Sequence, residues 1–590
     1  MDPQALIFDA AQNQWLAFNA PLETICTRNL AELHDSLRYI ENLVNHKGVW
    51  AAGFISYEAA PAFDKILSTH TNPDFPALWF GIYQKPTLVR QPLGTPSYDQ
   101  PRIDWQPSIS RDDYNSAIAR IKKFIAAGDT YQVNFTLRLR ARLPEEFQSW
   151  DYFRVLIESQ PVGYGAFIDI GDYAICSASP ELFFNLEGST ITTRPMKGTV
   201  RRGRNSIEDA EFAEWLQNSE KNRAENVMIV DMMRNDLGKI ARPGSVAVPN
   251  LFKLERYPTV WQMVSDVAAE TDASVSEIIA ALFPAASVTG APKPRTTQLI
   301  NELENSPRHI YTGSIGFLAP GRRAQFNVAI RTVLIDKIRN SAEYGVGGGI
   351  VWDSQPHEEY NECLTKSKVL ANRPPEFALL ETMRWSPDTG YFLLDRHLAR
   401  LTESAKYFDF PISIDAIRAE LDLLASSLSG NQRIRLLVSK TGAISLEHQP
   451  LLESTPEGPV RLRLADAPVD ASDAFLHHKT SNRATYDHAL AKADDCDDVI
   501  LWNQSGEVTE TCIYNLIIET PDGRLLTPPV SCGLLAGTYR ALLIEQGKIT
   551  EQVVTLAALK SAVSISVINS VRGIRPALLC AALAPTSPLT

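Results

Sequence analysis

Residues 194–199, with the sequence RPMKGT, place one lysine between two runs that favour extended structure. Residues 182–186 and 190–193 lead into the stretch as predicted strands, and Pro195 and Gly198 disfavour a helix across it. We therefore expect Lys197 in a short connection, presented rather than packed on a helix face. A lysine in a connection is usually a solvated cation, so its meaning depends on residues further along the chain.

The composition is that of a globular protein with more than one core. The chain has 590 residues, of which 44% are hydrophobic and 21% charged, and this length predicts two or more domains. A net charge of -12 and the lack of a basic run argue against nucleic-acid binding. Small molecules and proteins are therefore the expected partners.

The cysteines and the N-terminal sequence bear on the compartment. The 7 cysteines are odd in number and contain no Cys-x-x-Cys pair, which indicates a reducing compartment and no structural zinc. No basic segment followed by an apolar run opens the sequence, and no apolar run reaches membrane-spanning length. We expect a cytoplasmic protein without a membrane segment.

The pattern of apolar residues predicts an α+β protein with a break near residue 373. Residues 1–110 are rich in short strand-like runs, and residues 111–370 alternate helices and strands. The sequence ANRPP at 371–375 predicts a stiff linker, since two prolines resist helix continuation. Residues 376–590 form a further predicted domain. In it we expect strands at 377–385, 389–394 and 433–437 and a helix at 397–408.

Acidic residues recur on two predicted helices of the first half. Glu225 lies in the helical run 220–231, and Glu359 and Glu362 are three apart and so project from one helix face. A divalent hard cation such as Mg²⁺, held by a few carboxylates plus water and substrate oxygens, would relieve their repulsion. An ordinary solvated acidic face is the alternative for any such pair.

Glycines and a buried arginine indicate where an anion could bind. Glycine lets a backbone approach a ligand closely, so we consider Gly347, Gly348, Gly349 and the TGAPK stretch with Thr289 and Gly290 as carboxylate-binding candidates, with tight turns as the alternative. Arg331 lies in the apolar run 326–335, which we expect to form a buried strand. A buried arginine needs an anionic partner.

These elements together resemble the chorismate-utilising enzymes, a family that includes anthranilate, isochorismate, salicylate and aminodeoxychorismate synthases. The resemblance covers about residues 111–370 and implies a sandwich of large, mainly antiparallel sheets with outer helices. It implies that Glu225 and Glu362, with Glu359 close by, hold Mg²⁺ on the ring carboxylate of chorismate. Arg331, Lys366 and the amides of residues 347–349 would hold the substrate carboxylates. The matching stretches are 128–134, 179–181, 194–199, 224–236, 289–293, Arg331 and 347–366.

Within this family two positions separate the reactions. Water-adding members carry a lysine where this chain has Gln132, so hydroxylation is disfavoured. Anthranilate synthases carry a small residue where this chain has Lys197, as aminodeoxychorismate synthases do. By resemblance Lys197 adds to C2 of the ring as the C4 hydroxyl leaves, ammonia adds at C4, and Glu181 is the general acid. The chain departs from many relatives at Gln262, where they have histidine, and at Asn222, where they have an acid.

The second half carries a different constellation. Lys479 is followed by Asn482 and Arg483, Glu510 lies in GEVTET, and residues 533–540 form a glycine-containing turn that enters a predicted helix. A lysine for an imine, an acid for a pyridinium nitrogen and a helix N-terminus for a phosphate together describe a site for pyridoxal phosphate. Residues 376–590 resemble fold-type IV pyridoxal-phosphate enzymes, an α/β fold.

The second resemblance implies roles for individual residues. Lys479 would be the Schiff-base lysine, Glu510 the partner of the ring nitrogen, and Arg400 a phosphate ligand. Gly537 and Thr538 would add phosphate contacts, with residues 569–570 as weaker candidates. The Lys-x-x-Asn-Arg spacing favours the aminodeoxychorismate lyase branch. The opening strand and turn of the family are missing.

Together the two resemblances imply a two-step synthesis of 4-aminobenzoate, a folate precursor, from chorismate and ammonia. Since no Gly-x-Cys-x-Gly glutaminase motif occurs in the chain, we expect a separate glutamine amidotransferase subunit. Three alternatives stay open: an anthranilate synthase-like first half, an aminotransferase second half, and a non-catalytic second half. Fold-type IV enzymes as a group also suggest a homodimer.

Overall fold

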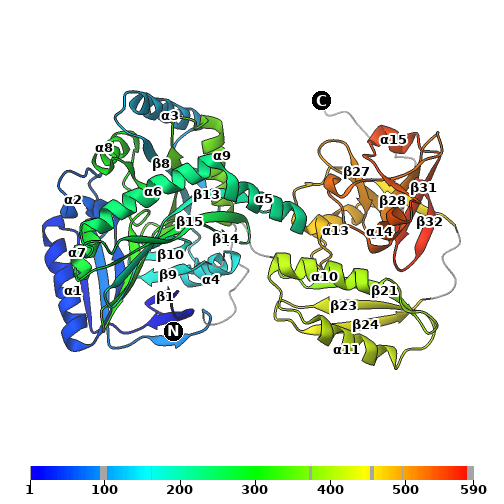
Figure 1. Ribbon diagram of the computed structural model, residues 1–590, viewed down its shortest axis with the longest axis horizontal. Coiled ribbons are helices and arrows are strands. Elements are labelled where there is room, and N and C mark those ends of the chain that lie inside the picture. Colours follow the sequence, from blue (N-terminus) through cyan, green and yellow to red (C-terminus); the bar gives the residue numbers. More distant parts are fainter. Residues whose placement is uncertain are drawn as a thin grey trace. The chain divides into compact units, whose positions relative to one another are not determined.

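The structure is a computed structural model that describes residues 2–92, 103–160, 162–370, 375–451, 458–493 and 496–580. It divides into two compact units: unit 1 comprises residues 1–201 and 213–374, and unit 2 comprises residues 202–212 and 375–590 (Figure 1). Four of the five residues of the predicted linker, 371–374, lie outside the described residues.

Unit 1 contains two ten-stranded sheets in which the strand pairings are antiparallel. The first has the order β16-β8-β20-β19-β10-β9-β1-β2-β6, with β7 beside β8. Its strands are β1 Ala5–Asp9, β2 Gln14–Phe18, β6 Thr87–Val89, β7 Gln106–Pro107, β8 Gln132–Arg142, β9 Tyr164–Asp169, β10 Tyr173–Ser179, β16 Gly290–Ala291, β19 Thr332–Asp336 and β20 Ser341–Ile350.

The second sheet has the order β13-β15-β12-β11-β18-β17-β4-β5-β3, with β14 beside β15. Its strands are β3 Glu23–Thr27, β4 Trp50–Ile55, β5 Leu78–Tyr83, β11 Leu182–Glu187, β12 Thr190–Arg194, β13 Met196–Arg201, β14 Ala247–Arg256, β15 Val260–Glu270, β17 Ser314–Ala319 and β18 Arg323–Val328.

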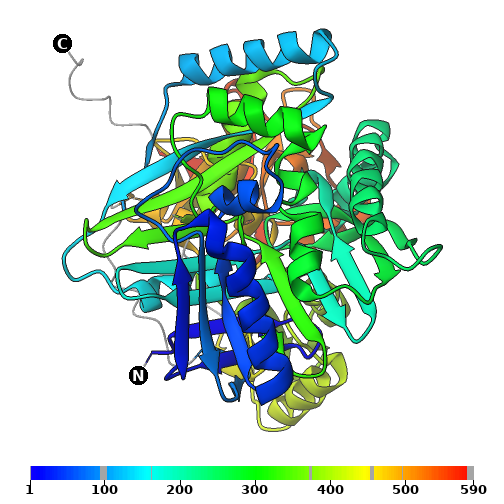
Figure 2. The same ribbon diagram turned by 90° about the vertical axis from the view of Figure 1, so that its left-hand side faces the viewer.

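Helices cover the outer faces of the two sheets. Ser110 caps α3 by accepting from the Asp113 amide, and Ser219 caps α6 through the Asn222 amide. Figure 2 shows α1 lying over the strands of the second sheet. The helices of unit 1 are α1 Leu33–Lys47, α2 Ala60–Phe63, α3 Arg111–Ala126, α4 Ser149–Ser159, α6 Glu220–Gly238, α7 Val275–Leu282, α8 Lys293–Leu303 and α9 Pro356–Ser367; α5 Ser206–Asn218 begins in the unit 2 segment 202–212 and ends in unit 1.

Three apolar cores make unit 1 a layered sandwich. Side chains of both sheets, among them Ile7 from β1 and Phe54 from β4, form the core between them. A second core joins the first sheet to α3, α4, α8 and α9, and a third joins the second sheet to α1, α6 and α7. Burial of apolar surface on both faces of each sheet therefore holds the layers together.

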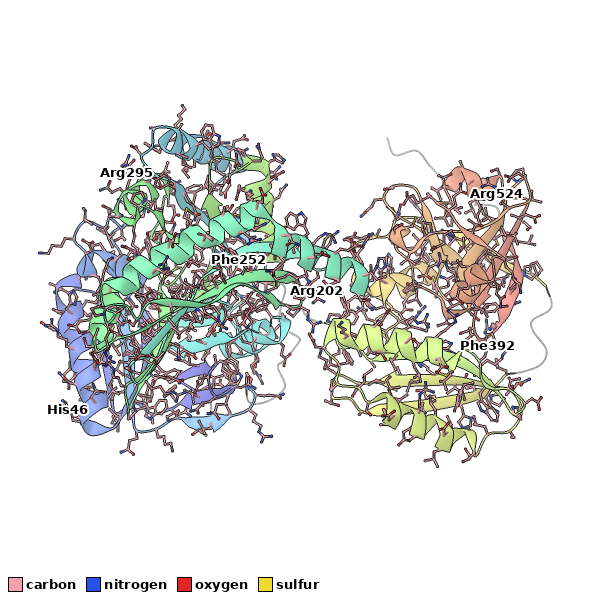
Figure 3. The ribbon with its side chains drawn as sticks, in the orientation of Figure 1. His46, Arg202, Phe252, Arg295, Phe392 and Arg524 are labelled. Atoms are coloured by element: carbon pink, nitrogen blue, oxygen red, sulfur yellow. The ribbon has the colours of Figure 1, made fainter. Side chains whose placement is uncertain are left out.

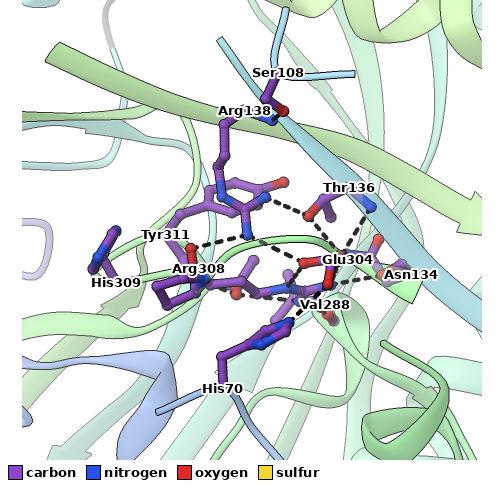
Figure 4. Close-up of polar contacts among 12 residues, drawn as sticks. His70, Ser108, Asn134, Thr136, Arg138, Val288, Glu304, Arg308, His309 and Tyr311 are labelled. Atoms are coloured by element: carbon purple, nitrogen blue, oxygen red, sulfur yellow. Dashed lines mark hydrogen bonds and ion pairs between the residues drawn. The ribbon is translucent and has the colours of Figure 1, made fainter. Parts of the chain in front are cut away.

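A buried ionic cluster ties α8 to β8 (Figure 4). Glu304, directly after α8, accepts from Arg308 Nη2 at 2.6 Å, from Arg138 Nη2 at 3.1 Å and from the Thr136 hydroxyl at 2.7 Å. Burial opposes ionisation of Glu304, but the guanidiniums of Arg308 and Arg138 outweigh it and lower the pKa of this carboxyl. The cluster secures the strand that also carries Gln132.

Unit 2 contains a four-stranded antiparallel sheet of order β22-β21-β23-β24 and a mixed eight-stranded sheet of order β27-β26-β25-β32-β31-β28-β29-β30. The strands are β21 Leu379–Ser386, β22 Gly390–Tyr391, β23 Gln432–Val438, β24 Ile444–Pro450, β25 Val460–Leu464, β26 Asp498–Trp502, β27 Val508–Thr511, β28 Asn515–Glu519, β29 Leu525–Thr527, β30 Thr550–Glu551, β31 Ser564–Asn569 and β32 Gly573–Leu579.

The helices of unit 2 follow the apolar pattern of the sequence. One face of α10 and α11 packs on the small sheet through residues such as Leu401, Leu421 and Ile434. Arg202, labelled in Figure 3, lies with its guanidinium 4.6 Å from the ring centroid of Tyr407 on α10. The helices are α10 Leu394–Phe408, α11 Ile414–Ala425, α12 Ala474–His477, α13 Ala484–Leu490, α14 Thr538–Glu545 and α15 Leu556–Lys560.

The predicted α+β class, with large antiparallel sheets and outer helices, is confirmed. The strand predicted at 389–394 is wrong beyond the two residues of β22, because the chain turns there and α10 starts at Leu394. In the part of the chain that the structure describes, none of the helices combines the length and the apolar character needed to cross a membrane.

Candidate functional site

Lys197 lies on β13 and not in a connection, which corrects the sequence-based expectation. The pairing of β13 with β15 shifts register between Met196 and Thr199, and Gly198 has a φ of 96°. Backbone strain of this kind favours glycine. The Asn226 amide donates to the Lys197 carbonyl at 3.3 Å, and the Gln262 amide donates to that of Gly198 at 2.8 Å. Hydrogen bonds from α6 and from β15 therefore stabilise the irregular backbone at Lys197 and Gly198.

The amine of Lys197 points towards β20 and β8. A Cβ built on Gly349 would lie 2.6 Å from Lys197 Nζ and 2.6 Å from Gln132 Nε2, so any side chain larger than glycine would collide with both. Burial lowers the pKa of Lys197, while the nearby carboxylate of Glu225 opposes that shift. A lysine with a lowered pKa is a better nucleophile at neutral pH.

Glu181 lies close to Lys197, at the turn between β10 and β11. Its side chain is buried, and burial raises its pKa to about 7, although a hydrogen bond from Ser287 and the charge of Lys197 act in the opposite direction. Its backbone is fixed, since the Ser179 hydroxyl accepts from the Glu181 amide and the Val328 amide donates to the Glu181 carbonyl. A carboxyl group with this pKa can donate a proton near neutral pH.

Gln132, beside Lys197, and Arg331 each have buried polar atoms without a hydrogen-bond partner among the described residues. Both amide atoms of the buried Gln132 and the buried Nη1 of Arg331 have no hydrogen-bond partner. Arg331 does not lie in a strand as expected: it has a φ of 50° and connects β18 of one sheet to β19 of the other. Burial lowers the pKa of Arg331. The donors Gln132 Nε2 and Arg331 Nη1 fit a ligand with anionic oxygens, whereas Gln132 Oε1 needs a hydrogen-bond donor.

Residues Gly347, Gly348 and Gly349 belong to the strand β20, so the tight-turn alternative is wrong. β20 pairs with β8 as far as Ile350, but β19 pairs with β20 only up to Tyr344. One edge of the glycine segment therefore has no neighbouring strand among the described pairings. Lys366 donates to the Gly347 carbonyl at 2.9 Å.

Thr289 and Gly290 support the neighbouring strand β8. The Thr289 hydroxyl donates to the Ala285 carbonyl at 3.1 Å, and Gly290 pairs with Val133 in the strand pair β16–β8. A Cβ on Gly290 would collide with the Gln132 carbonyl. Direct contact of these two residues with substrate stays a prediction.

The three acidic candidates come from α6 and α9. Burial raises the pKa of Glu359, and the charge of Glu362 adds to this rise, whereas Lys366, 2.7 Å from Glu362, lowers the pKa of Glu362. No three His, Cys, Asp or Glu side chains among the described residues lie close enough together to hold a metal ion. Carboxylates in this arrangement fit Mg²⁺ that keeps water and takes substrate oxygens, rather than a complete protein cage.

In unit 2 the predicted site residues line one pocket of about 420 Å³. Burial lowers the pKa of Lys479 to about 8, and the charge of Arg400 adds to the effect. The Lys479 carbonyl accepts from the Leu380 amide at 3.0 Å, which fixes the backbone next to β21. The residues that the pocket brings together include Lys479, Arg400, Glu510, Gly537, Thr538, Asn569 and Ser570.

Glu510 is buried at the end of the pocket near Lys479. It accepts from the Tyr486 hydroxyl at 2.8 Å, the Asn515 amide at 3.1 Å and the Leu535 amide at 3.1 Å. Burial raises its pKa to about 7. An acid so held fits a pyridinium nitrogen, which would return the carboxyl to its ionised form.

The predicted phosphate end contains two residues that sequence reasoning missed. Arg400 donates to Glu381 through Nε at 2.9 Å and Nη2 at 2.7 Å, and Glu381 also binds His397 at 2.6 Å. Thr538, the first residue of α14, lies 3.3 Å from the other nitrogen of His397. Glu381 and His397 thus orient the candidate phosphate residues. In the sequence, the one available signal for Glu381 and His397 was that both are polar residues in elements with an apolar pattern, a predicted strand and a predicted helix.

Comparisons with known proteins agree with this geometry. The family model of the chorismate binding enzymes matches residues 2–372, and that of the class IV aminotransferases matches residues 378–580. Aminodeoxychorismate synthase component 1 of Klebsiella aerogenes is 35% identical over 342 residues, which are 54% of this chain and 75% of the relative.

Other relatives are covered less completely. The chloroplastic aminodeoxychorismate synthase of Arabidopsis thaliana is 38% identical over 295 residues, 49% of this chain, and the chain spans only 32% of that relative's length. The crystal structure of anthranilate synthase component I from Streptococcus pneumoniae matches with a TM-score of 0.53 and 24% identity, over 63% of this chain and 93% of that one, which supports the fold.

The sandwich, the glycine strand beside Lys197 and the match over residues 2–372 lead to one assignment: this chain belongs to the chorismate binding enzyme family and continues into a class IV aminotransferase domain.

Proposed function

We propose that the chain makes 4-aminobenzoate from chorismate and ammonia in two steps, as an aminodeoxychorismate synthase component I fused to an aminodeoxychorismate lyase. One observation carries the proposal: each unit has a lysine whose pKa burial lowers, next to a glutamate whose pKa burial raises to about 7. Perturbed acid and base pairs of this kind concentrate at active sites. The similarity to aminodeoxychorismate synthases supports the assignment of the first step.

In unit 1, Lys197 adds to C2 of the ring, the double bond shifts, and the C4 hydroxyl leaves as water with the proton of Glu181. Ammonia then adds at C4 and expels the lysine, which gives 4-amino-4-deoxychorismate. Arg331, Lys366 and the open edge of residues 347–349 bind the substrate carboxylates. Gln132 offers no base for water, so hydroxylation does not compete.

Mg²⁺ and an ammonia source complete the first step. Glu225, Glu359 and Glu362 would hold the ion, which supplies positive charge to a substrate carboxylate. Ammonia comes from glutamine through a separate amidotransferase subunit, because the sequence has no Gly-x-Cys-x-Gly motif. Glutamine should therefore fail as nitrogen donor for the purified chain alone, while ammonium serves.

In unit 2, pyridoxal phosphate when bound supplies an electron sink for the substrate amine. Lys479 would hold the cofactor between turnovers, and its amine would carry the proton that is transferred as pyruvate leaves. Glu510 would pair with the pyridine nitrogen. Arg400, Gly537 and Thr538 would bind the phosphate. We place the enzyme in the cytoplasm and allow for a homodimer through unit 2.

The test supplies the purified chain with chorismate, Mg²⁺, ammonium and pyridoxal phosphate and identifies the products by chromatography. We expect 4-aminobenzoate and pyruvate without a keto-acid acceptor. Lys197→Ala should stop before the aminated intermediate, and Lys479→Ala should accumulate it. Anthranilate as product would overturn the first assignment, and a requirement for a keto acid would overturn the second.

A further inference from the structure

The pocket of unit 2 carries more positive charge than its cofactor requires. Six arginines line it, Arg400, Arg433, Arg435, Arg483, Arg540 and Arg572, and among these described lining residues Glu510 is the one acid. Arg540 pairs with Glu551, and Arg400 pairs with Glu381 beside the helix α14. The phosphate end thus accounts for Arg400 but leaves a second group of cations unexplained.

This second group comes from two distant segments. Arg433 and Arg435 lie on β23, two residues apart, so they point to the same face of the small sheet. The alternate residues Ile434 and Leu436 point to the other face of the sheet, where they are buried against α10 and α11. Arg572 lies in the turn between β31 and β32, where its Nη1 donates to the Tyr514 hydroxyl at 2.7 Å. We call these three side chains the arginine cluster.

Within the cluster the charges are only partly compensated. Arg435 lies 3.3 Å from the partly exposed Glu447, while the side chain of Arg433 makes no hydrogen bond or ion pair among the described residues. Partial burial lowers the pKa of Arg433, and the positive charges of Arg572 and Arg435 lower it further. Like charges held together at a pocket wall are stabilised by an anionic ligand.

We propose that the arginine cluster binds the carboxylates of the amine substrate in unit 2 and selects a dicarboxylate over an ordinary monocarboxylate amino acid. The inference rests on the proposed lyase step, whose substrate carries one carboxylate on the ring and one on the enolpyruvyl group. Planar guanidiniums match carboxylates by paired hydrogen bonds, and two carboxylates need more than one of them. The cluster thereby separates this unit from an aminotransferase for simple amino acids.

Binding can be measured without turnover. Isothermal titration calorimetry on the full chain loaded with pyridoxal phosphate compares 3-(carboxymethoxy)benzoate, a dicarboxylate, with the monocarboxylate 3-methoxybenzoate. We expect the dicarboxylate to bind at least tenfold more tightly. Arg433→Gln and Arg572→Gln should each weaken the dicarboxylate at least tenfold and the monocarboxylate less than threefold.

Arg384→Gln is the matched control. Arg384 faces Arg433 directly across the pair β21–β23, but its guanidinium lies 4.7 Å from the ring of Phe392, labelled in Figure 3, and does not line the pocket. Arg384→Gln removes one positive charge from the same sheet. This substitution should change the affinity for either benzoate by less than twofold. The absorption band of the bound cofactor should be the same in all variants.

Activity separates this inference from the proposed function. With 4-amino-4-deoxychorismate as substrate, the two cluster variants should raise KM at least tenfold and change kcat less than threefold. Equal binding of the two benzoates to the unsubstituted chain, or an unchanged KM in both variants, would overturn the cluster's role. If the unsubstituted chain releases no pyruvate but prefers the dicarboxylate, the lyase assignment fails while the binding site stands.

Discussion

Replacing Glu181 with glutamine tests the proposed general acid, because the amide keeps the shape of the side chain but has no acidic proton. With a pKa of about 7, Glu181 is protonated to about 90% at pH 6, about 50% at pH 7 and about 10% at pH 8. The amination rate, expressed per concentration of free ammonia, should therefore fall above pH 7. Glu181→Gln should lose this falling limb and slow amination by about 10² to 10⁴-fold.

The same substitution should change stability in the opposite direction. Burial raises the pKa of Glu181 from 4.5 to about 7, so the contribution of its neutral form is complete below pH 4.5 and is lost as pH rises through 7. At about 1.4 kcal/mol for each pH unit, the ionised side chain costs about 3 kcal/mol at pH 8 and less than about 1 kcal/mol at pH 5. Glu181→Gln should be more stable than the unsubstituted chain by up to these amounts.

Urea unfolding at pH 5 and pH 8, followed by tryptophan fluorescence, measures this gain, and the cofactor absorption band reports unit 2 separately. Glu187→Gln is the matched control, since Glu187 ends the same strand β11 but is exposed; it should leave rate and stability unchanged at both pH values. If Glu181→Gln keeps the falling limb, or is no more stable than the unsubstituted chain at pH 8, the reasoning about this carboxyl is refuted.

Four further results are expected. Glu304→Gln should destabilise unit 1 by about 3 to 5 kcal/mol in urea unfolding, because buried Arg308 loses its ion-pair partner and buried Arg138 keeps only Glu343, 3.9 Å away; a loss below about 1 kcal/mol would contradict this. Arg331→Gln should raise the KM for chorismate at least tenfold with kcat nearly constant, and an unchanged KM would exclude Arg331 from substrate binding. Removal of Mg²⁺ with a chelator should stop amination but not pyruvate release from supplied 4-amino-4-deoxychorismate, so loss of both steps would argue against a magnesium site confined to unit 1. Glu510→Ala should lower the kcat of the lyase step at least 10²-fold while the cofactor still binds, and a normal rate would remove Glu510 from the mechanism.

Local sequence patterns predicted helices and strands well, but they did not predict the surroundings of individual residues. The helix predicted at 397–408 and the i,i+3 spacing of Glu359 and Glu362 on a helix both appear in the structure, within α10 and α9. Such patterns depend on neighbours within one or two turns. The conformation of Arg331 does not, because its positive φ arises where the chain passes from one sheet to the other.

Long-range pairing explains the rest of what the sequence could not predict. Lys197 lies on a strand because β13 pairs with β15, which begins more than sixty residues later, through an irregular register. The glycines of β20 lie in a strand rather than a turn, and one edge of this segment has no neighbouring strand among the described pairings because the pairing of β19 with β20 ends at Tyr344. Glu381 lies on β21, and His397 and Arg400 lie on α10, so they come into contact only when the strand and the helix pack together. Their spacing along the chain does not predict this contact.

The charges around Lys197 and around Lys479 favour different ligands in the two units. Around Lys197, the charges of Glu225 and Glu362 oppose that of Lys366, so a divalent ion that binds together with a dianionic substrate leaves the charge balance of the site unchanged. Around Lys479 the arginines are in excess, and anions alone restore the balance: one phosphate and the substrate carboxylates. A metal ion beside Lys479 would increase the excess of positive charge there. The proposed ligands therefore match the charge of each site: Mg²⁺ with a dicarboxylate beside Lys197, and a phosphate with the substrate carboxylates beside Lys479.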